Sequence, residues 1–219
     1  MSLCSSAATI RAVLFDWDGT LVDSYHADAQ SYLAMFKEMG VDWAEEELAR
    51  HYSPDWYRVY RAAGIPEWRW DDADRLWRDF YERHEPGLMR GARRVLSALK
   101  PRFVLGIVTS GDRTRVLAQV RRFRLTRMFA ACVCSEDARC RKPNPAPIQL
   151  ALRRMRLSPR ESVYVGDAPE DIQMARRAGV RTIAVLGPFP THQRLRAAQP
   201  CALLRSIGEL PGLLLGTRF

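Results

Sequence analysis

The chain alternates short apolar runs with amphipathic helical stretches over most of its length. The first run, residues 10–15, is rich in β-forming residues and ends at an acidic, glycine-containing turn, which is typical of a buried parallel strand. Similar runs lie at 103–108, 131–134, 162–165 and 182–185, and helical patterns lie beside them at 91–99, 112–123, 145–155 and 169–178. This alternation predicts an α/β fold with a doubly wound parallel sheet and right-handed crossovers.

One segment, residues 24–88, departs from this alternation. Four amphipathic stretches follow one another there with no strand between them, at about 25–39, 43–51, 54–63 and 70–84. Five of the six tryptophans also fall in this segment, and aromatic residues at helical spacing are typical of the core of a small helical bundle. We therefore predict an all-helical domain, residues 24–88, inserted into an α/β core of residues 8–23 and 89–219.

The net charge changes sign at the same boundaries. Residues 24–88 contain 8 Lys and Arg against 14 Asp and Glu, a net charge of −6, and the remainder has a net charge of +15. The basic residues are spread along helical faces, and no short Lys/Arg-rich run with interleaved aromatics occurs, so the sequence does not predict nucleic-acid binding. The opposite charges suggest the hypothesis that the inserted domain closes over the core by electrostatic attraction.

Other classes of protein are disfavoured by simple features of the sequence. No apolar run approaches the roughly 20 residues that span a bilayer, and the N-terminus lacks the basic and apolar regions of a signal peptide. We therefore expect a cytoplasmic protein without a membrane partner, either a monomer or a dimer. Five cysteines without a Cys-x-x-Cys pair argue against a disulfide framework and a zinc site, and Cys132 and Cys134 are interpreted as buried thiols on one face of a strand.

Two pairs of aspartates follow predicted strands. Asp16 and Asp18 come after the first apolar run, and their spacing of two places both side chains on one side of the chain and Trp17 on the other. Asp167 and Asp171 follow the fourth run. Helix caps or Asx turns would also explain such residues. However, four carboxylates at one sheet edge would repel one another without a cation, and oxygen ligands favour Mg²⁺.

Three further residues at the same predicted edge suit an anionic substrate. Thr109 and Ser110 end a predicted strand before a helix, where a hydroxyl and free backbone N–H groups can bind phosphate oxygens. Lys142 precedes another predicted helix, and the chain has only three lysines beside 31 arginines. A compact ammonium can neutralise a phosphate and a carboxylate together, although a surface lysine is an equally simple reading of Lys142 considered alone.

These four elements together resemble the signature set of the haloacid dehalogenase superfamily. The set comprises Asp-x-Asp-Gly-Thr, a strand-end Thr or Ser, a Lys before a helix, and Gly-Asp-x-x-x-Asp, and it occurs here in the family's order over the whole predicted core. The helical insert resembles the cap of the branch that includes phosphoglycolate phosphatases and β-phosphoglucomutases. The resemblance implies a Rossmann-like core with a helical cap that opens and closes about hinges near residues 20–24 and 86–90.

The resemblance also implies an activity, a magnesium-dependent hydrolysis of a small phosphorylated metabolite. Asp16 would attack phosphorus and form an aspartyl-phosphate, and Asp18 would act as general acid and base. It also implies that Mg²⁺ is bound by Asp16, the Asp18 carbonyl and Asp167, with Asp171 binding directly or through another ligand. The phosphoryl oxygens would be bound by Thr109, Ser110 and Lys142.

Particular residues distinguish a phosphatase from three alternatives. A dehalogenase of this superfamily carries a neutral aromatic residue where Asp18 stands, so that activity is disfavoured. A phosphomutase of the β-phosphoglucomutase type places a histidine ten residues beyond the second motif aspartate, where this chain has Asp28 and the nearest histidine is His26. A non-catalytic protein that binds a phosphorylated ligand stays an alternative, although Asp16 and Asp18 are both intact. Residues that contact the rest of a substrate are not evident; weak candidates are Arg58, Arg61, Tyr25 and His26.

Overall fold

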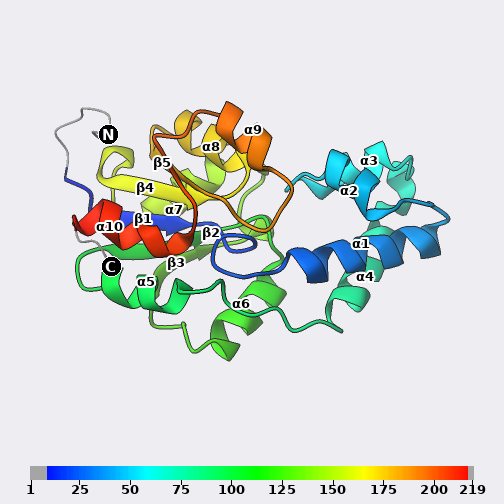
Figure 1. Ribbon diagram of the computed structural model, residues 1–219, viewed down its shortest axis with the longest axis horizontal. Helices are drawn as coiled ribbons and strands as arrows, with labels where there is room; N and C mark the ends of the chain where they lie inside the picture. Colours follow the sequence, from blue (N-terminus) through cyan, green and yellow to red (C-terminus); the bar gives the residue numbers. More distant parts are fainter. Residues whose placement is uncertain (1–8, 217–219) are drawn as a thin grey trace.

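The α/β core is built on one fully parallel sheet, as the alternating pattern predicted. The computed structural model describes residues 9–216 (Figure 1). Its six strands have the order β3-β2-β1-β4-β5-β6. They are β1 (Ala12–Phe15), β2 (Val104–Val108), β3 (Phe129–Val133), β4 (Ser162–Gly166), β5 (Arg181–Val185) and β6 (Ala202–Leu204). Five of them match the predicted apolar runs to within a few residues, and β6 was not predicted.

Helices cover both faces of this sheet (Figure 1). One face packs against α5, α6 and α10, and the other packs against α7 and α8, with α9 beside α8. The core helices are α5 (Ala92–Leu99), α6 (Arg113–Arg122), α7 (Ala146–Met155), α8 (Pro169–Arg177), α9 (His192–Ala197) and α10 (Leu210–Leu215), with short 3₁₀ turns at Ser135–Asp137, Pro159–Glu161 and Ile207–Glu209. This two-sided covering explains why every residue of β1 is buried and apolar.

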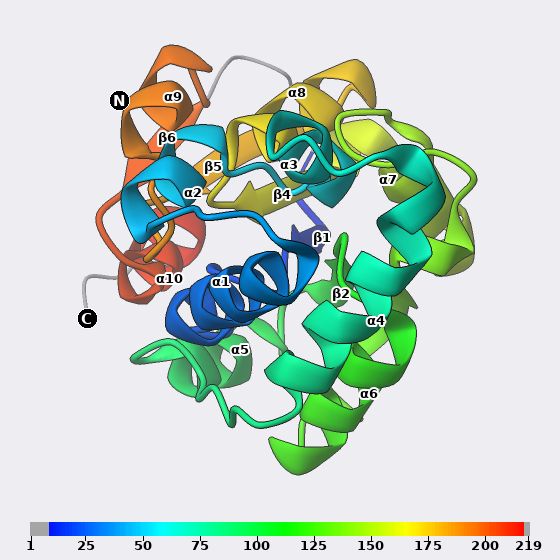
Figure 2. The ribbon, with the colours of Figure 1, turned by 90° about the vertical axis from the view of Figure 1, so that its right-hand side faces the viewer.

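The inserted segment forms a separate helical layer, the cap. Its helices are α1 (Tyr25–Met39), α2 (Glu45–His51), α3 (Trp56–Ala62) and α4 (Trp70–Tyr81), with a 3₁₀ turn at Glu67–Arg69. Helices α1 and α4 lie side by side (Figure 2), and the cap has a hydrophobic cluster of its own. Helices α2 and α3 begin two residues later than predicted, and α4 ends at Tyr81 instead of residue 84. All four helices lie inside the predicted limits of 24 and 88.

The two connections between cap and core lie next to each other. Val22 and Leu88 form an antiparallel bridge, and the N–H of Asp23 donates to the carbonyl of Gly87 at 3.0 Å. The chain therefore leaves the core and returns to it at one place. Both segments fall in the regions where hinges were predicted.

Two smaller predictions can be compared with the described residues. Cys134 is buried and Cys132 is half-buried, with their sulfur atoms 3.6 Å apart. Within residues 9–216, no helix is long and apolar enough to cross a membrane. Cys4 and the predicted outer limits of the core, residues 8 and 219, lie outside the described residues.

Candidate active site

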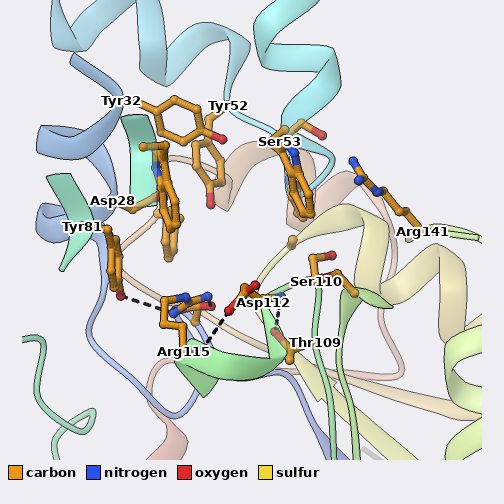
Figure 3. A pocket seen from close by; sticks show the side chains of 18 of the residues that line it. Asp28, Tyr32, Tyr52, Ser53, Tyr81, Thr109, Ser110, Asp112, Arg115 and Arg141 are labelled. Atoms are coloured by element: carbon orange, nitrogen blue, oxygen red, sulfur yellow. Dashed lines mark hydrogen bonds and ion pairs between the residues drawn. The ribbon is translucent and has the colours of Figure 1, made fainter. Parts of the chain in front are cut away.

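A cavity of about 350 Å³ lies between the carboxyl ends of the central strands and the cap. Figure 3 shows Tyr32 and Tyr52 of the cap on one side of the cavity and Thr109 and Arg115 of the core on the other. Asp16, Asp18 and Asp167 also line it, so three of the four predicted acids reach one space. The strand ends bring them together because all six strands run in the same direction.

Asp16 is held by two donors on one of its carboxylate oxygens. The backbone N–H of Trp17 donates to Oδ1 at 2.8 Å, and Lys142 Nζ lies 2.8 Å from the same atom. In the part of the chain that the structure describes, Oδ2 has neither a hydrogen bond nor an ion pair. Burial and then the charge of Asp171 raise the pKa of Asp16, Lys142 opposes both effects, and the net pKa is about 7. The carboxylate thus has one fixed oxygen and one available oxygen.

Lys142 is a buried ammonium between two carboxylates. Its Nζ lies 2.8 Å from Asp16 Oδ1 and 2.7 Å from Asp171 Oδ1. Burial alone would lower the pKa of Lys142, but the two carboxylates outweigh it and hold the pKa above its ordinary value. Only 3% of the residue is exposed, so the surface-lysine reading of Lys142 is wrong. This position, beside the strand-end acids, is the one that the sequence predicted for a phosphate-binding cation.

Asp171, the second carboxylate beside Lys142, is itself held by two hydrogen bonds. It is fully buried, and the hydroxyl of Tyr164 donates to its Oδ1 at 3.1 Å. The N–H of Ala168 donates to Oδ2 at 3.1 Å. Both oxygens of Asp171 therefore already have protein partners, which favours an indirect role in cation binding over direct coordination.

Asp167 is oriented by two threonine hydroxyls. Thr20 Oγ1 donates to Asp167 Oδ1 at 2.9 Å, and Thr191 Oγ1 donates to its carbonyl at 2.7 Å. Gly19 approaches the other carboxylate oxygen so closely that a Cβ atom there would overlap it, and Gly19 has a φ of +74°. Glycine is therefore required at this position both by the backbone conformation and by the space. Burial, followed by the charge of Asp16, raises the pKa of Asp167 well above its ordinary value.

The donor set fits a magnesium ion. One oxygen from each of Asp16, Asp167 and Asp171 lies within 4.8 Å of the others, and all three residues are buried. Carboxylate oxygens without sulfur or imidazole suit Mg²⁺ among the common metal ions. Burial, and then the charges of the neighbouring carboxylates, raise the pKa values of Asp16 and Asp167, although Lys142 opposes them; a divalent cation would stabilise the ionised form of the cluster.

Asp18 has a partner that sequence reasoning missed. Arg115, on α6, forms a two-pronged ion pair with it, with N–O distances of 3.0 and 2.7 Å. Burial alone would raise the pKa of Asp18, but Arg115 outweighs this and lowers it. Arg115 also contacts Tyr81 of the cap at 3.4 Å and Gln119 at 3.3 Å, and Gln119 accepts from Trp17 Nε1 on the opposite side of the motif.

The remaining candidates from the sequence differ in whether they line the cavity. Thr109 and Ser110 line the cavity, and the Thr109 hydroxyl accepts from the N–H of Gly111 at 3.0 Å. Arg61 pairs with Glu67 at 3.2 Å and is absent from the cavity wall. The cavity wall also lacks the other candidates for substrate contact, Arg58, Tyr25 and His26.

Comparison with known proteins agrees with this geometry. Residues 13–185 match the model of the haloacid dehalogenase-like hydrolase family. The pyrophosphatase PpaX of Bacillus pumilus is 30% identical over 93% of this chain and 95% of its own length. An N-acetylmuramic acid 6-phosphate phosphatase of Pseudomonas putida is 31% identical over 80% of this chain and 82% of its own length.

Solved structures agree on the fold. A haloacid dehalogenase-like hydrolase from Streptococcus pneumoniae superimposes with a TM-score of 0.81 at 23% identity, covering 93% of this chain and 98% of its own. That identity supports a common fold alone. The family match extends over more than three quarters of the chain and includes all four of its motifs. The chain therefore belongs to the haloacid dehalogenase-like hydrolases, as its motifs predicted.

Proposed function

We propose that the protein is a magnesium-dependent phosphomonoester hydrolase that forms an aspartyl-phosphate on Asp16. The observation that carries the proposal is the asymmetry of this carboxylate. Oδ1 is held by Lys142 and a backbone N–H, while Oδ2 has no partner among residues 9–216 and belongs to a residue that lines the cavity. The phosphatase names of two similar proteins support the same chemistry.

In the first step, an Asp16 oxygen forms a bond to phosphorus as the bond between phosphorus and the leaving oxygen breaks. Lys142 and the Thr109–Ser110 segment bind the phosphoryl oxygens, whose charge is spread widely in the transition state. Asp16, Asp167 and the Asp18 carbonyl would hold Mg²⁺, which neutralises phosphate charge when bound. Asp171 keeps Lys142 in place.

In the second step, water attacks phosphorus, inorganic phosphate leaves, and Asp16 is regenerated. Asp18 accepts the proton of this water. Its ion pair with Arg115 favours the ionised carboxylate, which suits a base. In the first step Asp18 donates a proton to the leaving oxygen, so it must be protonated at that point. This requires the ion pair between Arg115 and Asp18 to weaken when substrate binds.

The test is release of inorganic phosphate from p-nitrophenyl phosphate with and without Mg²⁺. Asp16→Asn is expected to lower kcat at least a thousandfold, because the amide is a poor nucleophile at phosphorus. Asp42→Asn, an exposed change of the same kind in the cap, is the matched control and should retain full activity. No phosphate release from any ester, or an Asp16→Asn variant as active as the control, would contradict the proposal.

A further inference from the structure

The cap side of the cavity is an aromatic wall. Six aromatic side chains of the cap line it, together with Asp28, Asp74 and Arg78: Tyr32, Tyr52, Trp56, Tyr60, Trp77 and Tyr81. Figure 3 shows Tyr32, Tyr52 and Tyr81 around the space that lies above Arg115. Since the phosphate site lies on the core side of the same cavity, this wall faces the position of the leaving group.

One carboxylate in this wall lacks a counter-ion. Asp28 of α1 lines the cavity, and no Lys, Arg or His nitrogen of residues 9–216 lies within 4 Å of its oxygens in an ion pair. Arg115, the cation that acts on it most, is held by Asp18. Burial, and then the charge of Asp18, raises the pKa of Asp28 to about 7. Tyr52 and Trp77 lie within hydrogen-bonding reach of the Asp28 carboxyl, and their effect on its pKa opposes that of burial.

The other carboxylate of the wall, Asp74, has a hydrogen-bond partner in the cap. Asp74 accepts a hydrogen bond from the Tyr60 hydroxyl at 2.9 Å, and the positive charges of Arg78 and Arg141 act on it. Arg141 itself lies over the rings of Trp56 and Tyr57, with its guanidinium carbon 3.8 and 3.9 Å from their centroids. In the described part of the wall, Asp28 is therefore the carboxylate that a cationic ligand would complement.

We propose that the substrate is a phosphate monoester whose leaving group carries a cationic nitrogen, bound by Asp28 and by the aromatic side chains that line the same wall. Aromatic faces attract organic cations, most strongly where water is excluded, and a carboxylate in the same wall adds charge attraction. A neutral apolar leaving group would cover the Asp28 carboxylate without supplying a counter-ion. This inference rests on the proposed phosphatase function and names its substrate class.

The inference separates this protein from the pyrophosphatase that it resembles. In pyrophosphate the leaving group is a second phosphate, and binding at the proposed leaving-group position would bring this anion to Asp28, a carboxylate that lines the cavity. Repulsion between like charges in a partly dehydrated cavity would oppose its binding. Pyrophosphate is therefore expected to be a poor substrate here.

The test compares esters of equal shape that differ in charge. Phosphocholine is paired with 3,3-dimethylbutyl phosphate, and phosphoethanolamine with propyl phosphate. With Mg²⁺ present, we expect kcat/KM to be at least tenfold higher for the cationic member of at least one pair. Asp28→Asn should remove this difference, and the exposed Asp42→Asn should retain it. Equal kcat/KM within both pairs, or a preference that survives Asp28→Asn, would overturn the inference.

A binding measurement separates failure of this inference from failure of the phosphatase proposal. Choline and its neutral analogue 3,3-dimethylbutan-1-ol are titrated against the protein, with quenching of tryptophan fluorescence as the readout, since Trp56 and Trp77 line the cavity. We expect choline to bind at least tenfold more tightly than the alcohol, and Asp28→Asn to abolish the difference. If no ester is hydrolysed but choline is still preferred, only the phosphatase proposal fails. If esters are hydrolysed and neither choline nor a cationic ester is preferred, only the inference fails.

Discussion

The stability of the metal-free protein should depend on pH through Asp16. The pKa of Asp16 rises from 3.8 to about 7 on folding, so between these values the folded state holds a proton that the unfolded state has lost. The free energy of unfolding therefore falls as pH increases through this window, and the Asp16 contribution is constant below and above it. At about 1.4 kcal/mol per pH unit, the full window corresponds to about 4 kcal/mol.

Magnesium should oppose this loss. At a concentration one hundred times its dissociation constant, a ligand that binds only the folded state adds about 2.7 kcal/mol. Protons compete for the same carboxylates, so the stabilisation should be large at pH 8 and small at pH 5. Urea unfolding followed by tryptophan fluorescence, in EDTA or in Mg²⁺ at both pH values, measures the two effects.

The variant Asp16→Asn isolates the residue responsible. Asparagine has no proton to lose, so the variant in EDTA should lose less stability than the wild type between pH 5 and pH 8. The difference between the two proteins is the quantity that tests the reasoning, and it includes the response of Asp167, whose pKa the charge of Asp16 raises in the wild type. The reasoning is refuted if the two slopes are the same, or if Mg²⁺ stabilises the wild type equally at pH 5 and pH 8.

Three further substitutions test single contacts. Lys142→Met removes the buried ammonium beside the nucleophile, so steady-state phosphate release should show a kcat at least a hundredfold lower; an unchanged kcat would contradict its role. Arg115→Lys keeps a positive charge but loses the two-pronged ion pair with Asp18, so kcat should fall about tenfold with a smaller change in KM. Equal kinetics would show that the two-pronged ion pair is not needed. Gly19→Ala places a methyl group against the Asp167 carboxylate, so half-activation in a Mg²⁺ titration should need at least tenfold more metal; an unaltered titration would argue against this site.

The strand-end acids could be predicted because their signal is local. Asp16 and Asp167 each follow an apolar run directly, and parallel strands bring such positions to one sheet edge. The pairing of Lys142 with Asp171 depends on the same edge and was anticipated in part, since Lys142 was placed there to bind phosphate and Asp171 to help bind the metal. What the sequence left open was whether the metal contacts Asp171, because this depends on how its two oxygens are already used.

Arg115 and Asp28 were missed because their roles depend on non-local geometry. Arg115 is one of 31 arginines and follows the basic pattern of a solvated helix, although its position three residues after the helix cap Asp112 turns it toward the motif. Asp28 belongs to a cap whose aromatic pattern predicts a bundle core and carries no information about which residues face the other domain. The strand β6 was missed because three half-buried or buried residues, Ala202–Leu204, have too short a pattern to indicate a period.

The single place of attachment between cap and core has a consequence for how such an enzyme can change. Because Val22 and Leu88 are bridged, the inserted segment begins and ends at neighbouring points, and its size can vary without stretching the sheet. The aromatic wall is thus encoded in one contiguous stretch, while the groups that we propose to bind phosphate and metal lie outside it. A recombinant exchange of that stretch between homologues would transfer selectivity as a unit, with the reaction chemistry inherited separately.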